Sequence, residues 1–251
     1  MDASLVDLWR ARGDQSQGDT YAGVGLAKLP EDLRAYEHIL WSRRVSVVVE
    51  IGVWAGGSSL WFRDRLRALA GYGRIGEPRV IGIDIDIGVA QANLEAADAE
   101  YAASITLVEG DVLDPELSER IARLVPRGAS CLVLDDSAHT YETTTAALRG
   151  YSDLIRPGGV FVVEDGGVDV EEIRLDRPWP RGVIPAIYDW LATDQGQSFR
   201  VRRDLELYGL TSHPHGFLER ALGGGGAPGG AGALGDAGAL GGAGAPGGDD
   251  R

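Results

Sequence analysis

Short apolar runs alternate with amphipathic stretches along most of this chain. Five of the runs are rich in β-branched residues and lead into glycine or acidic residues. They are Val45–Gly52, Arg79–Ile85, Ser104–Asp111, Ser130–Asp136 and Gly159–Asp165. Such near-continuous apolar strands are typical of a parallel sheet that is buried on both faces. We therefore predict that these runs form five parallel strands.

Segments with helical spacing of apolar residues lie between and around these strands. They are Pro30–Arg44, Ser58–Ala70, Pro115–Val125, Thr140–Ile155 and Ile184–Ala192. Two late segments, 199–205 and 216–222, have the pattern of strands that pair antiparallel. Alternation of strands and helices at this spacing predicts an α/β, Rossmann-like fold. Its doubly wound sheet is mostly parallel and ends in a late antiparallel strand pair.

A change in composition divides the chain into three parts. Residues 1–44 are expected to form an N-terminal helical or lid segment, and residues 45–222 the main domain. Residues 223–251 consist largely of glycine, alanine and proline and contain no aromatic residue. Such a segment cannot bury enough apolar surface to offset its ordering entropy, so we predict a disordered tail.

The charge balance argues against two classes of partner. The formal net charge is −14, and the basic residues cluster only at Arg43-Arg44 and at Arg200, Arg202 and Arg203. An acidic surface repels phosphate backbones and anionic lipids, so neither nucleic acid nor a membrane is expected as a partner. The chain has one cysteine and no secretory pattern at its start. We therefore predict a cytoplasmic location.

The carboxyl ends of the first three predicted strands carry the features of a nucleoside pocket. In an open α/β sheet, ligands bind beyond these ends. The first strand leads into the sequence EIGVWAGGSS, where glycines let the backbone pass close to a ligand. Acidic residues end the second and third strands and can accept hydrogen bonds from ribose hydroxyls and an adenine amino group. The predicted cofactor-binding residues are Glu50, Gly52, Gly56, Ser58, Asp84 and Asp111.

A second constellation follows the fourth and fifth strands. Asp136 and His139 follow the fourth strand, and Glu164 and Asp165 end the fifth. Three carboxylates that converge repel one another unless a cation or protons are bound, and oxygen ligands favour Mg²⁺ or Ca²⁺. We therefore predict Asp136, Glu164 and Asp165 as metal ligands. His139 is the predicted base that removes a proton from an acceptor hydroxyl.

Several nearby residues have simpler explanations. Asp135 is expected to cap the following helix. Cys131 is expected to pack in the core, and His213 and His215 to lie in a loop. Glu164 and Asp165 are consecutive, so both can reach one metal only if the chain bends there.

Taken together, these motifs resemble the cephalosporin hydroxylase and rhamnosyl O-methyltransferase family. Its members are class I S-adenosylmethionine-dependent methyltransferases despite the historical name, and the strand layout predicted above is the one that this resemblance implies. The resemblance covers nearly all of the predicted folded part. It begins with the segment 21–36, which contains Tyr21, Lys28, Pro30, Asp32 and Tyr36. It continues through the five strand ends and finishes with the segment 210–220, LTSHPHGFLER.

The fourth-strand motif also resembles the Asp-Asp-Gly-Ser-His motif of macrolide sugar O-methyltransferases. That resemblance implies a metal-binding and catalytic role for Asp136, a base at His139, and metal binding by Glu164 and Asp165. The chain departs from these patterns at Ser137-Ala138, at His213 before Pro214, and in its long Gly/Ala tail. The first departure leaves the spacing of Asp136 and His139 intact, whereas the others concern substrate choice and linkage.

The resemblance implies Mg-dependent O-methylation of a sugar hydroxyl on a glycosylated natural product, with S-adenosylmethionine as cofactor. It also implies a homo-oligomer, and it makes Tyr21 and Lys28 candidate lid or substrate contacts. A β-lactam nucleus or an amino-sugar nitrogen remains open as the acceptor. A non-haem iron oxygenase and a non-catalytic binding protein remain as remote alternatives. The oxygenase needs two histidines beside a carboxylate.

Overall fold

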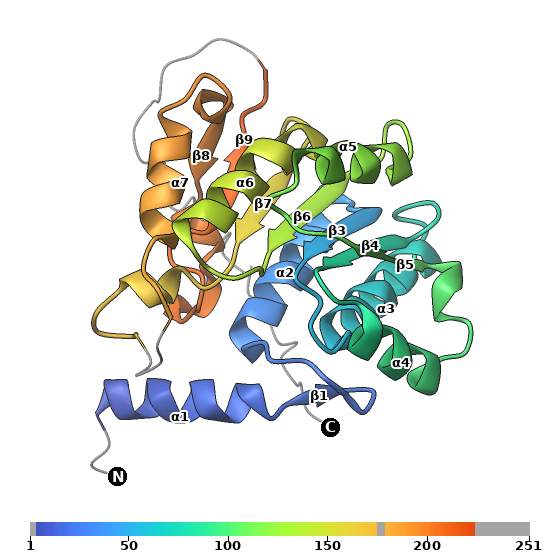
Figure 1. Ribbon diagram of the computed structural model, residues 1–251, viewed down its shortest axis with the longest axis horizontal. Helices are drawn as coiled ribbons and strands as arrows, with labels where there is room; N and C mark the ends of the chain where they lie inside the picture. Colours follow the sequence, from blue (N-terminus) through green and yellow to red (C-terminus); the bar gives the residue numbers. More distant parts are fainter. Residues whose placement is uncertain (1–3, 175–178, 224–251) are drawn as a thin grey trace, which may run out of the picture.

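A seven-stranded sheet runs through the middle of the protein between two layers of helices (Figure 1). The computed structural model describes residues 4–174 and 179–223. The strand order is β5-β4-β3-β6-β7-β9-β8. The strands are β3 (Val47–Ile51), β4 (Arg79–Asp84), β5 (Ile105–Glu109), β6 (Cys131–Asp135), β7 (Val160–Val163), β8 (Phe199–Val201) and β9 (Phe217–Arg220). The predicted disordered tail lies outside the described residues from position 224 onward.

The first five of these strands along the chain are parallel, and β9 pairs antiparallel with both β7 and β8. The predicted sheet, including its late antiparallel pair, is therefore confirmed. The chain proceeds outward from β3 to β5 and then returns to place β6 on the other side of β3. This reversal puts a topological switch point between β3 and β6, where ligands bind in open α/β sheets.

Helices cover both faces of the sheet, as predicted for a doubly wound fold. One face is covered by α2 (Pro30–Arg43), α3 (Gly57–Gly71) and α4 (Gly88–Ala97), and the other by α5 (Pro115–Leu124), α6 (Tyr141–Tyr151) and α7 (Val183–Leu191). Short 3-10 helices lie at Tyr101–Ala103, Ser152–Leu154, Gly166–Asp169, Gly196–Ser198, Arg203–Leu205 and Leu207–Gly209. Among the described residues, no helix has the length and apolar character needed to span a membrane.

Two helices and one hairpin were not predicted individually from the sequence. They are α1 (Leu5–Gln17), the hairpin of β1 (Thr20–Tyr21) with β2 (Val24–Gly25), and α4. Helix α1 is polar on most of its surface and buries only Trp9, Gly13 and Ser16, so its hydrophobic pattern is weak. A capping box between Ser4 and Asp7 begins it. The hairpin has only two residues in each strand, too few for a visible alternation.

The structure corrects the predicted role of Asp135. The cap of α6 is Thr140, whose side chain accepts a hydrogen bond from the backbone N–H of Thr143. Asp135 instead ends β6, is buried, and accepts a 2.7 Å hydrogen bond from the Ser137 hydroxyl. Burial raises its pKa to about 6. The prediction that Cys131 packs in the core is confirmed.

Gly52 is a point where two strand ends touch through the backbone. Its φ is +91°, and a Cβ atom there would lie 1.9 Å from the Asp136 carbonyl oxygen. We expect Gly52→Ala to lower the free energy of unfolding by about 2 kcal/mol or more, since left-handed strain adds to a backbone clash. Chemical denaturation measures this loss.

Gly73→Ala is the matched control, because Gly73 also has a positive φ (+66°) but nothing lies within 4 Å of its added Cβ. This substitution should lower the free energy of unfolding by only about 1 kcal/mol, because it adds left-handed backbone strain without a clash. Equal losses in the two variants would show that the contact between the strand ends is unimportant.

Candidate active site

The glycine-rich loop after β3 is pinned by a carboxylate from the neighbouring strand. Gly52 and Gly56 both have positive φ, which lets the chain turn sharply from β3 into α3. At the end of β4, Asp84 Oδ2 accepts hydrogen bonds from the backbone N–H groups of Val53 (2.9 Å) and Trp54 (3.0 Å). Asp84, the residue predicted to bind the ribose hydroxyls, thus lies directly against the glycine-rich loop that was predicted to approach the cofactor.

Glu50 lies beneath this loop and is fully buried. It accepts a 2.5 Å hydrogen bond from the Ser59 hydroxyl in the first turn of α3, beside the buried Ser58. Among the described residues, its Oε1 atom has no hydrogen-bond partner. Burial raises the pKa of Glu50 to about 7, although the Lys28 ammonium opposes this shift.

Asp111 stands apart from the other predicted cofactor residues. It is exposed beyond the end of β5, two strands away from β3, and its Oδ1 accepts a hydrogen bond from the N–H of Leu113. The structure therefore gathers Glu50, Gly52, Gly56, Ser58 and Asp84 around one loop and leaves Asp111 at the edge of the sheet.

Three of the predicted catalytic and metal-binding residues form one cluster at the ends of β6 and β7. Asp136, His139 and Asp165 each offer a ligand atom, and these atoms lie within 4.8 Å of one another. His139 Nε2 is 3.2 Å from Asp165 Oδ2 and 3.8 Å from Asp136 Oδ1. Burial lowers the pKa of His139, but the surrounding carboxylates, led by Asp165, outweigh it and raise the pKa above its usual value.

Glu164, the third predicted metal ligand, lies one layer deeper. Its Oε2 accepts a 2.6 Å hydrogen bond from Lys28 Nζ, and the same ammonium lies 2.5 Å from Asp136 Oδ2. Burial lowers the pKa of Lys28, yet attraction to Asp136, Glu164 and Glu50 raises it well above the usual range. Lys28 is therefore a buried cation that links two of the three predicted metal-binding carboxylates.

The segment that carries the family resemblance near the N-terminus forms the back of this site. Lys28, Asp32 and Tyr36 are four residues apart, and the latter two share one face of α2. Asp32 accepts hydrogen bonds from the hydroxyls of Thr211 (2.5 Å) and Ser212 (2.7 Å). Tyr36 donates to Glu164 Oε1 at 2.8 Å. The segment therefore ties the carboxylates to the turn before β9.

His213 is a buried member of this inner layer and was not predicted as a site residue. It is 1% exposed, whereas the sequence analysis placed it in a loop and connected it only with substrate choice. Its turn reaches β7 because Gly216 packs on the Val163 carbonyl, 2.0 Å from where a Cβ would be. The glycine two residues after Pro214, next to an apolar strand, was the sequence signal for this close approach.

The two predicted lid or substrate residues differ in their surroundings. The Tyr21 hydroxyl donates to Asp64 of α3 at 2.9 Å, whereas Lys28 is 4% exposed and held by carboxylates. Contact of either residue with a substrate stays a prediction.

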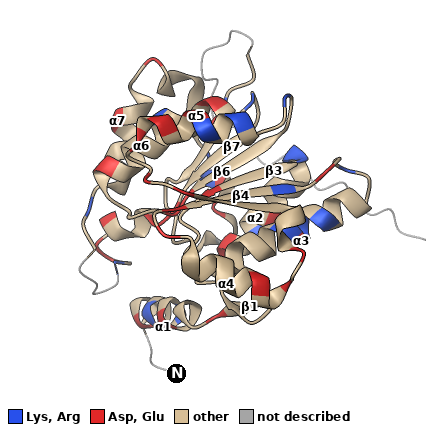
Figure 2. Cartoon of the chain, turned by 45° about the vertical axis from the view of Figure 1, so that its right-hand side comes forward, with Lys and Arg blue, Asp and Glu red and all other residues tan. Residues whose placement is uncertain are grey.

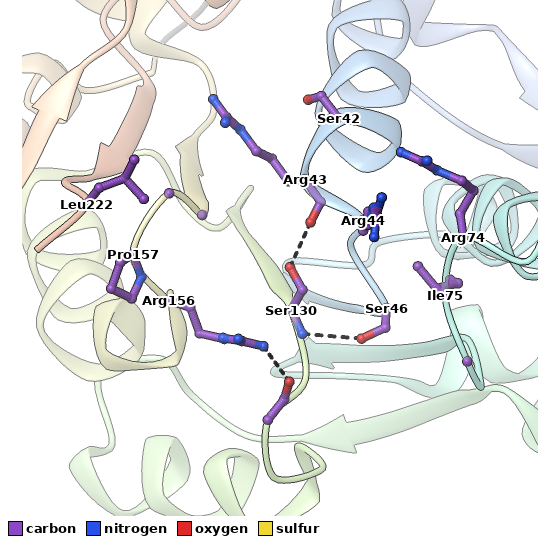
Figure 3. A pocket seen from close by; sticks show the side chains of 14 residues that line it. Ser42, Arg43, Arg44, Ser46, Arg74, Ile75, Ser130, Arg156, Pro157 and Leu222 are labelled. Carbon is purple, nitrogen blue, oxygen red and sulfur yellow. Dashed lines mark hydrogen bonds between the residues drawn. The ribbon is translucent and has the colours of Figure 1, made fainter.

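A cavity lies at the end of the sheet opposite the acidic cluster. It has a volume of about 520 Å³ and is lined in part by Arg43, Arg44, Arg74 and Arg156, near the starts of β3, β4, β6 and β7 (Figure 3). Figure 2 shows acidic residues around one end of the central strands and basic residues near the other. The arginine-lined cavity is thus separated from the acidic cluster by the length of the strands.

The fold and the carboxylates beside a glycine-rich loop define the class I methyltransferase architecture. A family model for rhamnosyl O-methyltransferase/CmcI proteins matches residues 15–221. The chain belongs to this family, which confirms the predicted family and the predicted enzyme class, a methyltransferase.

Individual relatives agree with this assignment, and solved structures share the fold. The rhamnosyl O-methyltransferase of Mycobacterium bovis (strain BCG / Pasteur 1173P2) is 28% identical over 209 residues, which cover 80% of this chain and 78% of the relative. A structure of CmcI with Mg and SAM is 22% identical, with a TM-score of 0.57 and coverage of 82% of this chain and 77% of that chain.

The mycinamycin-pathway methyltransferase MycE, in complex with Mg, SAH and mycinamycin VI, is 22% identical. Its TM-score is 0.50, and the match covers 78% of this chain and 51% of MycE. Both structures share the fold of this chain.

The raised pKa of Glu50 predicts a pH-dependent loss of stability. Because the folded-state pKa of this carboxyl is about 7, above its ordinary value of 4.5, the folded state binds more protons than the unfolded state between these pH values. Stability attributable to Glu50 therefore falls as pH rises through this window. Relative to Glu50→Gln, the wild type should lose about 2 kcal/mol between pH 5.5 and pH 8.

Urea denaturation at both pH values measures the difference. Glu171→Gln is the control, since the Glu171 side chain is 76% exposed and its replacement should leave the pH profile unchanged. Parallel profiles for wild type and Glu50→Gln would contradict the assignment.

Proposed function

We propose that this protein is an S-adenosylmethionine- and Mg²⁺-dependent O-methyltransferase that acts on a sugar hydroxyl of a glycosylated natural product. The observation that carries the proposal is the cluster of Asp136, His139 and Asp165 next to the glycine-rich loop. The names of the relatives support the acceptor class, because they include rhamnosyl O-methyltransferases and an enzyme bound to mycinamycin VI.

The cofactor would lie against the loop between β3 and α3. Asp84 would hold the ribose hydroxyls and Asp111 the adenine amino group, with Gly52 and Gly56 allowing close approach of the backbone. Glu50 and Ser58 would shape the floor beneath the loop. In the structure, the Asp84 contacts to Val53 and Trp54 hold this loop.

The residues at the ends of β6 and β7 have donors that suit Mg²⁺. Asp136 and Asp165 present carboxylate oxygens to one small space, and Glu164 follows directly behind them. Hard oxygen ligands of this kind favour Mg²⁺ over softer metals. When bound, the ion would orient the acceptor hydroxyl and lower its pKa.

His139 would take the proton from the acceptor hydroxyl. Its Nε2 lies 3.2 Å from Asp165 Oδ2, so this carboxylate would stabilise the imidazolium that forms when the ring takes the proton. The raised pKa makes His139 a stronger base, and it also means that the active neutral form increases as pH rises.

The geometry gives little support to an iron oxygenase. Among the described residues, the candidate metal cluster contains one histidine, His139. His213 contacts Tyr36 and the backbone of Asp165 instead, so the two histidines do not converge with a carboxylate in the manner of a facial triad.

We also propose that the protein is a cytoplasmic homo-oligomer that binds neither nucleic acid nor membranes. Its chain would consist of an N-terminal helical or lid segment (1–44), the methyltransferase domain (45–222) and a disordered tail (223–251). The net charge of −14 supports the absence of nucleic acid and membrane partners, because an acidic surface repels phosphate backbones and anionic lipids.

Calorimetric titration with S-adenosylhomocysteine, in the presence of Mg²⁺ and again with EDTA, tests the cofactor assignment. Micromolar-class binding is expected. No binding under either condition would contradict the methyltransferase proposal. A screen of glycosylated acceptors, with the matching aglycones as controls, then tests the sugar.

His139→Ala should lower kcat by about two to four orders of magnitude, because it removes the general base. The pH–rate profile should also lose the limb that rises through the His139 pKa. His38→Ala is a matched control on the exposed surface of α2 and should retain full activity. A full-rate His139→Ala enzyme would remove His139 from the mechanism.

A further inference from the structure

Glu164 and Asp165 are adjacent in sequence but serve different layers of the site. Glu164 points inward to Lys28 and Tyr36, whereas Asp165 faces His139. The chain makes this division with a left-handed residue, since Asp165 has a φ of +54°. For a residue other than glycine, this conformation costs about 1 kcal/mol and needs support from its surroundings.

His213 supplies direct support for this turn. Its Nδ1 atom accepts a 2.9 Å hydrogen bond from the backbone N–H of Asp165. A neutral histidine that accepts at Nδ1 carries its proton on Nε2, so this contact defines the tautomer of the ring. The Nε2 atom in turn lies 2.8 Å from the Tyr36 hydroxyl oxygen.

The proton positions make the network directional. His213 Nε2–H donates to the Tyr36 oxygen, and the Tyr36 O–H donates to Glu164 Oε1 at 2.8 Å. One chain of hydrogen bonds therefore runs from the Asp165 backbone to the Glu164 carboxylate. Both rings are fully or almost fully buried, at 0% and 1% exposure, so water does not replace these contacts easily.

Other contacts hold the two rings in place. The Tyr36 and His213 rings are stacked with centroids 5.9 Å apart, and the Phe217 ring packs edge-on against His213 with centroids 6.2 Å apart. Asp32 fixes the neighbouring Thr211 and Ser212 hydroxyls. The imidazole is thus built into the end of the sheet rather than carried on an exposed loop.

We infer that His213 and Tyr36 are a positioning pair that sets the Glu164–Asp165 turn and so determines how tightly the acidic cluster holds its metal. His213 acts through the Asp165 backbone and touches no reacting atom. The inference rests on the proposed function only for the identity of the metal.

Two substitutions at His213 distinguish the roles of its two ring nitrogens. In His213→Asn, the amide oxygen takes the place of Nδ1 and can still accept from the Asp165 N–H. In His213→Gln, the longer amide takes the place of Nε2 and can reach Tyr36, but the Asp165 N–H loses its acceptor. Both variants remove the same buried ring, so a loss of packing affects both.

The first readout is Mg²⁺ affinity, measured by calorimetry on the full chain. We expect His213→Gln to weaken Mg²⁺ binding by about tenfold or more, the effect typical of losing an outer partner of a metal ligand. His213→Asn should stay within about threefold of wild type, since it keeps the acceptor. His215→Gln is the matched control two residues away and should leave the affinity unchanged. Equal weakening by Asn and Gln would overturn the inference.

A second readout does not depend on a metal. Hydrogen exchange of the Asp165 amide, followed by NMR, should be slow in wild type and His213→Asn and faster in His213→Gln. If wild type binds no Mg²⁺, the metal assignment in the proposed function fails, but the amide exchange still decides the positioning role. Unchanged exchange in His213→Gln would refute it.

Discussion

The arrangement of the acidic site depends on the ion pairs that the buried Lys28 ammonium makes with Asp136 and Glu164. Two adjacent parallel strands deliver Asp136, Glu164 and Asp165 to one edge of the sheet, and like charges at this separation repel one another. Lys28 is 4% exposed and contacts Asp136 and Glu164 at 2.5 and 2.6 Å. Removing one partner from such a buried group leaves an uncompensated charge, which is costly. The cation therefore lets the carboxylates converge.

This cation comes from the N-terminal segment, which makes that segment part of the site rather than an appendage. Lys28 precedes α2, and the next two turns of the same stretch place Asp32 on the turn before β9 and Tyr36 on Glu164. Residues near position 30 and near position 212 are thereby joined across the ends of β6 and β7. A lid that opened by lifting this segment would have to expose Lys28 and its two carboxylates. Within the described residues, α1 and the β1–β2 hairpin are hydrogen-bonded instead to Ile173 and to Asp64.

The sequence predicted what depends on local pattern. The β-branched runs and their terminal acids identified the five parallel strands, and Asp136 with His139 lay within one short loop, so their proximity followed from the fold. Contacts between distant segments have no such signal: Lys28 is 108 residues from Asp136, and Tyr36 is 177 residues from His213. Their role depends on which face of α2 meets the sheet and on the path of the turn before β9. For the same reason, Asp135 looked like a helix cap, although Thr140 had the better position for capping.

Backbone contacts, more than side chains, fix the separation between the loop after β3 and the acidic cluster. Gly52 touches the Asp136 carbonyl, and Gly216 touches the Val163 carbonyl next to Glu164. Any side chain at either glycine would push these strand ends apart. For a transfer reaction, the distance between donor and acceptor is decisive, because small displacements cost large factors in rate. In this protein that distance would be set by strand ends packed at glycine, and the side chains of Lys28, Tyr36 and His213 would then orient the carboxylates within a frame that is already rigid.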